Sequence, residues 1–209
     1  MSTLALVRTI VRQQVIPSDI RTEFFRKSIH ILIALVPLIA AAIGTGPTLS
    51  LLAGGVLFYT YTEIERSRGK TIPFVTRVTR AAARDADNPG RIILGPITLG
   101  IGAMVSLLLY PEPASVIAIY ALAFGDGISS IVGKAFGRVR IPRLQGKTLE
   151  GSAACFIVVF LVTLRIMDSV PAAGMVAMTA MTLEAIPVKD LDNILMPMGT
   201  GFVASLFLI

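Results

Sequence analysis

The residues of this chain best suited to phosphate chemistry are carboxylates at the ends of long apolar stretches. Asp126, Glu184 and Asp192 each lie where an apolar stretch meets a polar one, and a glycine flanks Asp126 on either side. Ionisable groups in such places are costly to bury and are functional candidates by default. Carboxylate oxygens near lysines and arginines suit a site in which a divalent cation bridges phosphate oxygens. We therefore expect these carboxylates to bind a divalent cation such as Mg2+. Each alone could equally form an interhelical ion pair or lie at the water interface, but the glycines beside Asp126 weaken that alternative for it, because they let a ligand approach closely. The other ionisable residues in comparable places are His30, Glu63, Glu65 and Asp190.

A glycine-rich basic segment follows Asp126. Residues 125–151 read GDGISSIVGKAFGRVRIPRLQGKTLEG and contain six glycines and five basic residues. Glycine-rich backbone exposes N–H groups that bind phosphate oxygens, while lysines and arginines neutralise their charge. A helix that opens at Thr148 would point its positive end at the same phosphates. We therefore predict a nucleotide loop at 133–149, in which Lys147 acts with Asp126 and Asp192 in catalysis. The nucleotide-binding candidates are Gly133, Lys134, Gly137, Arg138, Gly146, Lys147, Thr148, Glu150 and Gly151.

Long apolar blocks must position these residues. The chain is 54% hydrophobic and 15% charged, whereas a soluble domain averages about 25% charged residues. The blocks lie at 28–46, 48–62, 92–110, 113–132, 151–167, 170–187 and 192–209. Most approach the roughly 20 residues that a spanning helix needs. The sequence thus predicts an all-α polytopic membrane protein of about seven transmembrane helices, with residues 1–209 as one membrane-embedded domain.

The distribution of basic residues predicts the orientation of these helices. Of the 19 lysines and arginines, 18 lie before the first block or in alternate connections, and Arg165 is the exception. Because cytoplasmic loops carry the excess of Lys and Arg, the N-terminus is predicted to lie in the cytoplasm. Residues 1–27 are then an amphipathic cytoplasmic segment, and 63–91 a cytoplasmic basic loop with a surface helix. The same rule accounts for the net charge of +6, so no nucleic-acid partner is predicted.

A series of short motifs extends over most of the chain. They are Arg26-Lys27-x-x-His30, Glu65-Arg66, Gly125-Asp126, Gly133-Lys134-x-x-Gly137-Arg138, Gly146-Lys147-Thr148-Leu149-Glu150-Gly151, Glu184 and Asp192-Asn193-x-x-x-Pro197. In this combination they resemble the CTP-dependent lipid-alcohol kinases, which include dolichol kinase, phytol kinase and CTP-using diacylglycerol kinase. That family is distantly related to phosphatidate cytidylyltransferase. The short chain resembles the compact prokaryotic members of the family.

The resemblance implies phosphoryl transfer from CTP to the hydroxyl of a lipid alcohol in the bilayer, giving a lipid phosphate and CDP. The acceptor would be a polyprenol, a phytol-like alcohol or diacylglycerol, and the site would face the cytoplasm of a prokaryotic cell. The resemblance adds Arg26, Lys27, His30, Glu65 and Asn193 to the candidate site residues. Two alternatives stay open: CMP transfer of the phosphatidate cytidylyltransferase kind, and a small membrane transporter.

Overall fold

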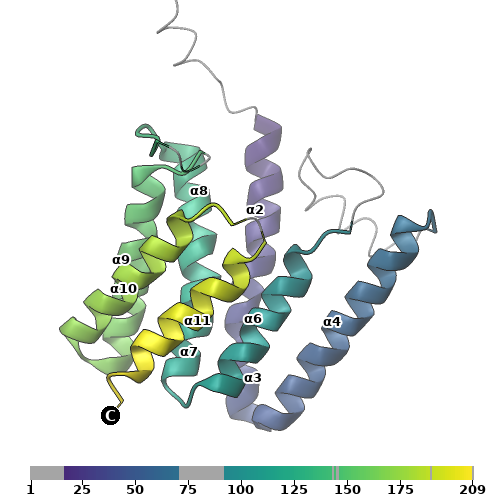
Figure 1. Cartoon of the computed structure of the whole chain (residues 1–209), viewed down its shortest axis with the longest axis horizontal. Helices are drawn as coiled ribbons and strands as arrows, with labels where there is room; N and C mark the ends of the chain where they lie inside the picture. The colour runs from purple at the N-terminus through teal and green to yellow at the C-terminus, as the bar shows by residue number, and fades with distance from the viewer. Residues whose placement is uncertain (1–16, 71–91, 143, 145, 189, 209) are drawn as a thin grey trace, which may run out of the picture.

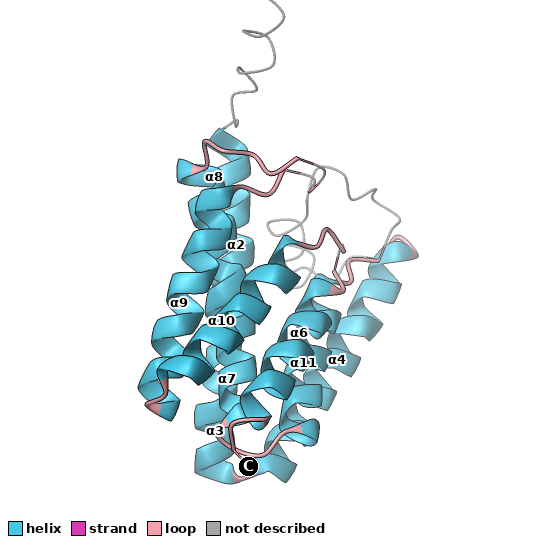
Figure 2. Cartoon of the chain, turned by 60° about the vertical axis from the view of Figure 1, so that its left-hand side comes forward, coloured by secondary structure: helices cyan, strands magenta, loops and turns pink. Residues whose placement is uncertain are grey.

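The computed structural model describes residues 17–70, 92–142, 144, 146–188 and 190–208, and all regular elements of these ranges are helical (Figures 1 and 2). The first part of the bundle consists of α2 (Pro17–Leu32), a short 3-10 turn (Ile33–Leu35), α3 (Val36–Ile43), α4 (Thr45–Ser67) and α6 (Gly95–Leu109). The second part consists of α7 (Ala114–Tyr120), the π-helical segment η2 (Ala121–Asp126), α8 (Gly127–Phe136), α9 (Leu149–Met167), α10 (Val170–Ala185) and α11 (Asp192–Ser205). The described helices therefore follow the predicted apolar blocks in order.

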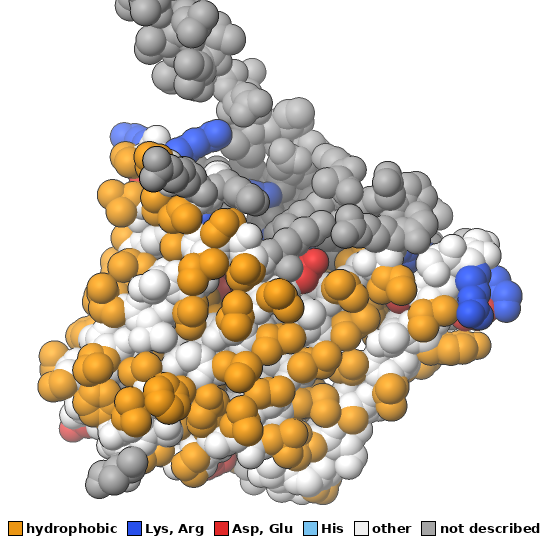
Figure 3. All heavy atoms as spheres, in the orientation of Figure 1, with side chains coloured by type: hydrophobic (Ala, Val, Ile, Leu, Met, Phe, Trp, Pro, Cys, Tyr) orange, Lys and Arg blue, Asp and Glu red, His pale blue; other side chains and the backbone are white. Residues whose placement is uncertain are grey.

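Three described helical stretches are long and apolar enough to cross a membrane: Arg26–Ile43, Ala114–Phe136 and Leu149–Met167. Two more, Gly95–Leu109 and Val170–Ala185, are apolar but shorter. Figure 3 shows apolar side chains spread over one face of the bundle, with lysine and arginine side chains toward its upper end. The all-helical class is confirmed, whereas the count of seven spans and the orientation stay predictions.

Several element bounds differ from the sequence-based expectation. The first helix begins at Pro17 and runs on into the first apolar block, so residues 17–27 belong to α2 rather than to a separate surface segment. Proline suits the first turn of a helix, and no glycine interrupts the residues that follow it. Residues 1–16 and the predicted surface helix within 71–91 lie outside the described residues. Gly133 and Lys134 belong to α8, so the loop before α9 begins only at Gly137.

Small side chains allow the helices of the second part to approach closely. The main buried cluster includes Ala121, Cys155, Ala177, Ala180 and Ala204, contributed by η2, α9, α10 and α11. Small residues at helix contacts let the backbones come near each other, as is common in membrane bundles. Large apolar side chains instead lie outside, where many leucines, isoleucines and phenylalanines are exposed. This arrangement is typical of a bundle whose outer surface contacts lipid.

Candidate active site

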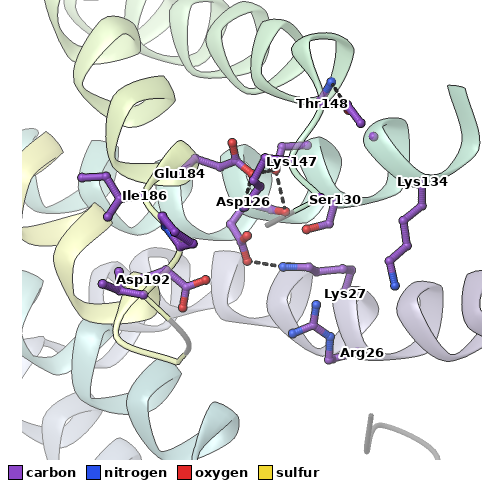
Figure 4. A pocket seen from close by; sticks show the side chains of 16 residues that line it. Arg26, Lys27, Asp126, Ser130, Lys134, Lys147, Thr148, Glu184, Ile186 and Asp192 are labelled. Carbon is purple, nitrogen blue, oxygen red and sulfur yellow. Dashed lines mark hydrogen bonds and ion pairs between the residues drawn. The ribbon is translucent and has the colours of Figure 1, made fainter. Parts of the chain in front are cut away.

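The candidate site is a pocket of about 350 Å3 at one end of the bundle, where α2, α8 and the α8–α9 and α10–α11 connections meet (Figure 4). Its wall carries four basic side chains and three carboxylates, namely Arg26, Lys27, Lys134, Lys147, Asp126, Glu184 and Asp192. Residues far apart in the sequence thus converge, as expected from their common place at helix ends. A pocket with an excess of positive charge favours a polyanionic ligand.

Asp126 is the last residue of the π-helical segment and is held by two basic side chains of α2. Lys27 forms an ion pair with the Asp126 carboxylate, and His30 Nδ1 lies 3.1 Å from Asp126 Oδ2. All three residues are buried. Lys27 and His30 are three residues apart and therefore share one helix face. The Arg-Lys-x-x-His motif thus places two basic groups on one carboxylate of another helix, and π-helical turns of this kind often mark functional sites.

Glu184, near the end of α10, forms the second charged cluster. Lys147 pairs with its carboxylate from the loop before α9. Ser129 Oγ donates to Glu184 Oε1 at 3.0 Å, and Ser152 Oγ donates to Oε2 at 3.3 Å. The carboxylate is buried, so these partners offset the cost of removing its charge from water. Glu184 therefore connects α8, α9 and α10 at the pocket.

The Asp-Asn-x-x-x-Pro motif divides its roles between the pocket and the neighbouring helix α6. Asp192 lines the pocket, whereas Asn193 Nδ2 donates to Thr98 Oγ1 at 2.9 Å and to the Gly95 carbonyl at 3.3 Å. Pro197 has no N–H to donate to the Asn193 carbonyl four residues earlier. That carbonyl packs so closely on Gly102 that a Cβ there would lie 2.0 Å from it. Asn193 thus fastens α11 to α6 and holds Asp192 at the pocket.

The loop between α8 and α9 is organised by Thr148 and Glu150. Thr148 caps α9, its Oγ1 accepting a hydrogen bond from the Gly151 N–H at 3.2 Å. Glu150 Oε1 accepts from the backbone N–H groups of Arg138 and Val139, at 3.0 and 3.1 Å. These bonds satisfy groups at a helix start and in a turn. Glu150 therefore shapes the loop rather than lining the pocket.

The glycines of this region allow a tight crossing of α8 and α9. A Cβ at Gly137 would lie 2.6 Å from Thr148 Cγ2, and one at Gly151 would lie 2.7 Å from the Ser129 carbonyl oxygen. Gly146 has a φ of +86°, which an L side chain rarely adopts. Gly133, Gly146 and Gly151 also line the pocket, but Gly137 does not. Close packing explains the glycines at 133, 137 and 151 and the positive φ explains Gly146, while their contact with phosphates stays a prediction.

The structure brings most of the predicted site residues together, but not all of them. The pocket lining contains Arg26, Lys27, Asp126, Gly133, Lys134, Gly146, Lys147, Thr148, Gly151, Glu184 and Asp192. Outside this lining lie His30, Glu65, Gly137, Arg138, Glu150 and Asn193. Of these, Glu65 lies at the end of α4, where Lys70 Nζ approaches its Oε2 to 2.6 Å. Glu65 thus takes part in an ion pair at the end of α4, and its place in the active site stays a prediction.

Two groups of lining residues escaped the sequence analysis. Ser129 and Ser130 follow Asp126 by three and four residues, so helical spacing alone could have placed them beside it. Ile186, Pro187 and Val188 form the other group, on the connection between α10 and α11. Nothing in their types distinguishes them from the apolar block that they end.

The pocket carries side chains that are suited to bind a divalent cation. Asp126, Glu184 and Asp192 supply the carboxylate oxygens that hard cations prefer, around one pocket. No cluster of three His, Cys, Asp or Glu ligands is already assembled among the described residues. Lys27 and Lys147 instead hold two of the carboxylates. The residues fit a cation that arrives with a polyphosphate, because phosphate oxygens would complete the ligand set and also attract the lysines.

Comparison with known proteins gives curated homologues that are lipid-alcohol kinases. The chain is 30% identical over 150 residues to a probable chloroplastic phytol kinase of Triticum aestivum, covering 63% of this chain and 48% of that protein. It is 27% identical over 213 residues to phytol kinase 1 of Arabidopsis thaliana, covering 90% and 67%. It is 38% identical over 85 residues to dolichol kinase of Saccharomyces cerevisiae, covering 41% and 16%. The resemblance indicated by the motifs is confirmed by these homologues.

The relationship to these kinases has limits in length and in the kinds of match found. The chain spans about half the length of the first curated relatives that it matches. No protein-family model matches it, and no solved structure does. The curated relatives are chloroplastic plant proteins and a yeast protein, so they lend no support to the expected prokaryotic membrane.

Proposed function

We propose that this homologue of phytol kinases and dolichol kinase is itself a lipid-alcohol kinase, with CTP as phosphoryl donor. The observation that carries the proposal is the pocket in which two lysine–carboxylate pairs, Lys27 with Asp126 and Lys147 with Glu184, lie beside a third carboxylate at the end of an apolar bundle. Such a place lets a water-soluble nucleotide meet a hydroxyl that is anchored in a bilayer. CTP as the donor rests on the resemblance of the motifs.

In the proposed reaction the basic residues bind the phosphates. Lys147 and Lys134 approach from the loop and from α8, and Arg26 from α2. The helix α9 begins beside them, and its first N–H groups favour an anion. With a triphosphate in the pocket, Lys27 and Lys147 would contact phosphate oxygens, and the carboxylates of Asp126 and Glu184 would be available to hold Mg2+. The cation would supply charge neutralisation on the phosphates.

Asp192 is the proposed partner of the acceptor hydroxyl. It lines the same pocket, and its Oδ1 accepts a hydrogen bond from the backbone N–H of Asn193 at 3.0 Å. The hydroxyl oxygen bonds to the γ-phosphorus, the bond from that phosphorus to the β-γ bridging oxygen breaks, and the hydroxyl proton passes to Asp192. The products are a lipid phosphate and CDP, and the protein contributes mainly position and charge.

We further propose that the bundle crosses the membrane seven times, with the pocket at the cytoplasmic face. The pocket end also carries Arg66 and Arg68 at the end of α4 and Lys134 at the end of α8. The C-terminus lies at the opposite end (Figure 1). Positive charge at one end of a membrane bundle favours the cytoplasmic side for that end. Cysteines placed at 46 and 112 should label from outside, and one placed at 140 only after permeabilisation; the reverse pattern would overturn this topology.

The reaction is tested with labelled CTP and purified protein. A panel of polyprenols, phytol, diacylglycerol and phosphatidate is offered with γ-labelled or α-labelled CTP, phosphatidate being the acceptor that a cytidylyltransferase needs. Entry of γ-label into lipid supports the kinase, entry of α-label supports a cytidylyltransferase, and entry of neither refutes both. Asp126→Asn should abolish the γ-transfer. Asp168→Asn is the matched control, since Asp168 ends α9 far from the pocket with a φ of 48° that asparagine tolerates.

A further inference from the structure

The pocket is polarised between a basic wall and an apolar wall. Arg26, Lys27 and Lys134 lie on one side of it, from α2 and α8, and Ile186 lies on the other (Figure 4). Among the described lining residues, the side chains of Ile186, Pro187 and Val188 are the apolar ones. Asp192 lies on the side of the apolar wall. The basic wall attracts the phosphates of the nucleotide. The apolar wall is therefore available to the other substrate, the acceptor.

Three residues after the apolar wall ends at Val188, an exposed apolar face of α11 begins. Leu191, Leu195, Met198 and Phe202 are all exposed, and their spacing of four, three and four residues places them on one side of the helix. This stripe begins one residue before Asp192 and runs toward the opposite end of the bundle. In a bilayer it contacts hydrocarbon along its length. An apolar path therefore leads from the surrounding lipid to the carboxylate side of the pocket.

From this continuity we infer that Ile186, Pro187 and Val188 form the acceptor subsite, which binds the first carbons of an apolar tail that bears a primary hydroxyl. The inference rests on the proposed kinase function and adds the residues that admit the acceptor. The tail lies along the exposed face of α11 and brings its hydroxyl beside Asp192. The opposite wall is unsuited to a tail, because buried or half-buried cations there would lose hydration without gaining a partner.

The first test separates the acceptor from the nucleotide in kinetics. Ile186→Ala should raise the acceptor KM, measured as mole fraction in mixed micelles, about tenfold, because up to three carbons of contact are lost. The nucleotide KM and the melting temperature should stay the same. Ile31→Ala is the matched control, since both isoleucines are 40% exposed but Ile31 does not line the pocket. An unchanged acceptor KM, or an equal rise in both variants, would overturn the subsite.

The second test needs no turnover. The chain contains no tryptophan, so Ile186→Trp and Ile31→Trp each introduce a single indole whose fluorescence a brominated long-chain primary alcohol quenches. The indole at 186 should show saturable quenching at mole fractions where the indole at 31 shows only the weak quenching of bulk lipid. Equal quenching at both positions refutes the subsite. Saturable quenching at 186 without lipid phosphate formation would keep the subsite and refute the kinase.

Discussion

Replacing Lys147 by alanine tests two roles of this lysine, its contribution to stability through an ion pair and its proposed contribution to turnover. Lys147 pairs with Glu184, whose side chain is 3% exposed, while the lysine side chain is 26% exposed. Breaking a fully buried pair costs about 3–5 kcal/mol, because the remaining charge stays buried without its partner. Ser129 and Ser152 still donate to the Glu184 carboxylate, and Lys147 is partly in water. We therefore expect Lys147→Ala to lower the free energy of unfolding by about 2 kcal/mol.

The same substitution should lower turnover about 100-fold or more, the scale for one preorganised charge lost from the transition state. The double variant Lys147→Ala with Glu184→Gln tests the stability effect by itself, because Glu184 is also a proposed Mg2+ ligand. Glutamine keeps a hydrogen bond to Ser129 but carries no charge, so most of the lost stability should return. Turnover should stay low in this double variant, since both the lysine charge on the phosphates and one proposed metal ligand are missing.

Unfolding in detergent and steady-state kinetics with varied nucleotide measure both quantities. Lys70→Ala is the matched control, because Lys70 also pairs with a glutamate, Glu65, but is 73% exposed and lies away from the pocket. It should change stability little, because an exposed ion pair is screened by water, and it should leave turnover intact. Normal nucleotide kinetics in folded Lys147→Ala protein would refute the role of this lysine.

Three further predictions concern residues around the pocket. Asn193→Leu should lower kcat at least about tenfold with little change in nucleotide KM, because α11 loses its hydrogen bonds to α6; an unchanged kcat would contradict a positioning role. Gly151→Ala should destabilise the fold by about 2 kcal/mol, whereas Gly174→Ala, on an open face of α10, should change the melting temperature little; equal effects would refute the close crossing. The hydrogen bond from Lys70 lowers the pKa of the Glu65 carboxyl, so its stabilisation is present above the ordinary glutamate pKa and fades as pH falls through the lowered pKa. The stability gap between the protein and its Glu65→Gln variant should therefore close in acid, and a gap independent of pH would contradict this.

The sequence by itself indicated the all-helical class and the depth in the bundle at which the charged residues lie. A charge in hydrocarbon is costly, so Asp126, Glu184 and Asp192 could be expected at the ends of apolar helices, beside the basic loops. The described helices follow the apolar blocks, and the pocket contains all three carboxylates. Hydropathy is a local property of the chain, and for that reason these features could be predicted from the residues alone.

Only the tertiary structure decided which groups are partners. Lys27 and Asp126 are 99 residues apart, and their pairing depends on how α2 and η2 rotate and pack against each other. The same packing turned Asn193 toward α6, directed the Glu150 carboxylate to the backbone of the α8–α9 loop and brought Ile186 to the pocket wall. Hydropathy reports the depth of a residue in a bundle but carries no information about the neighbour that it faces. That neighbour is set by close packing between helices, which is a non-local property of the whole fold.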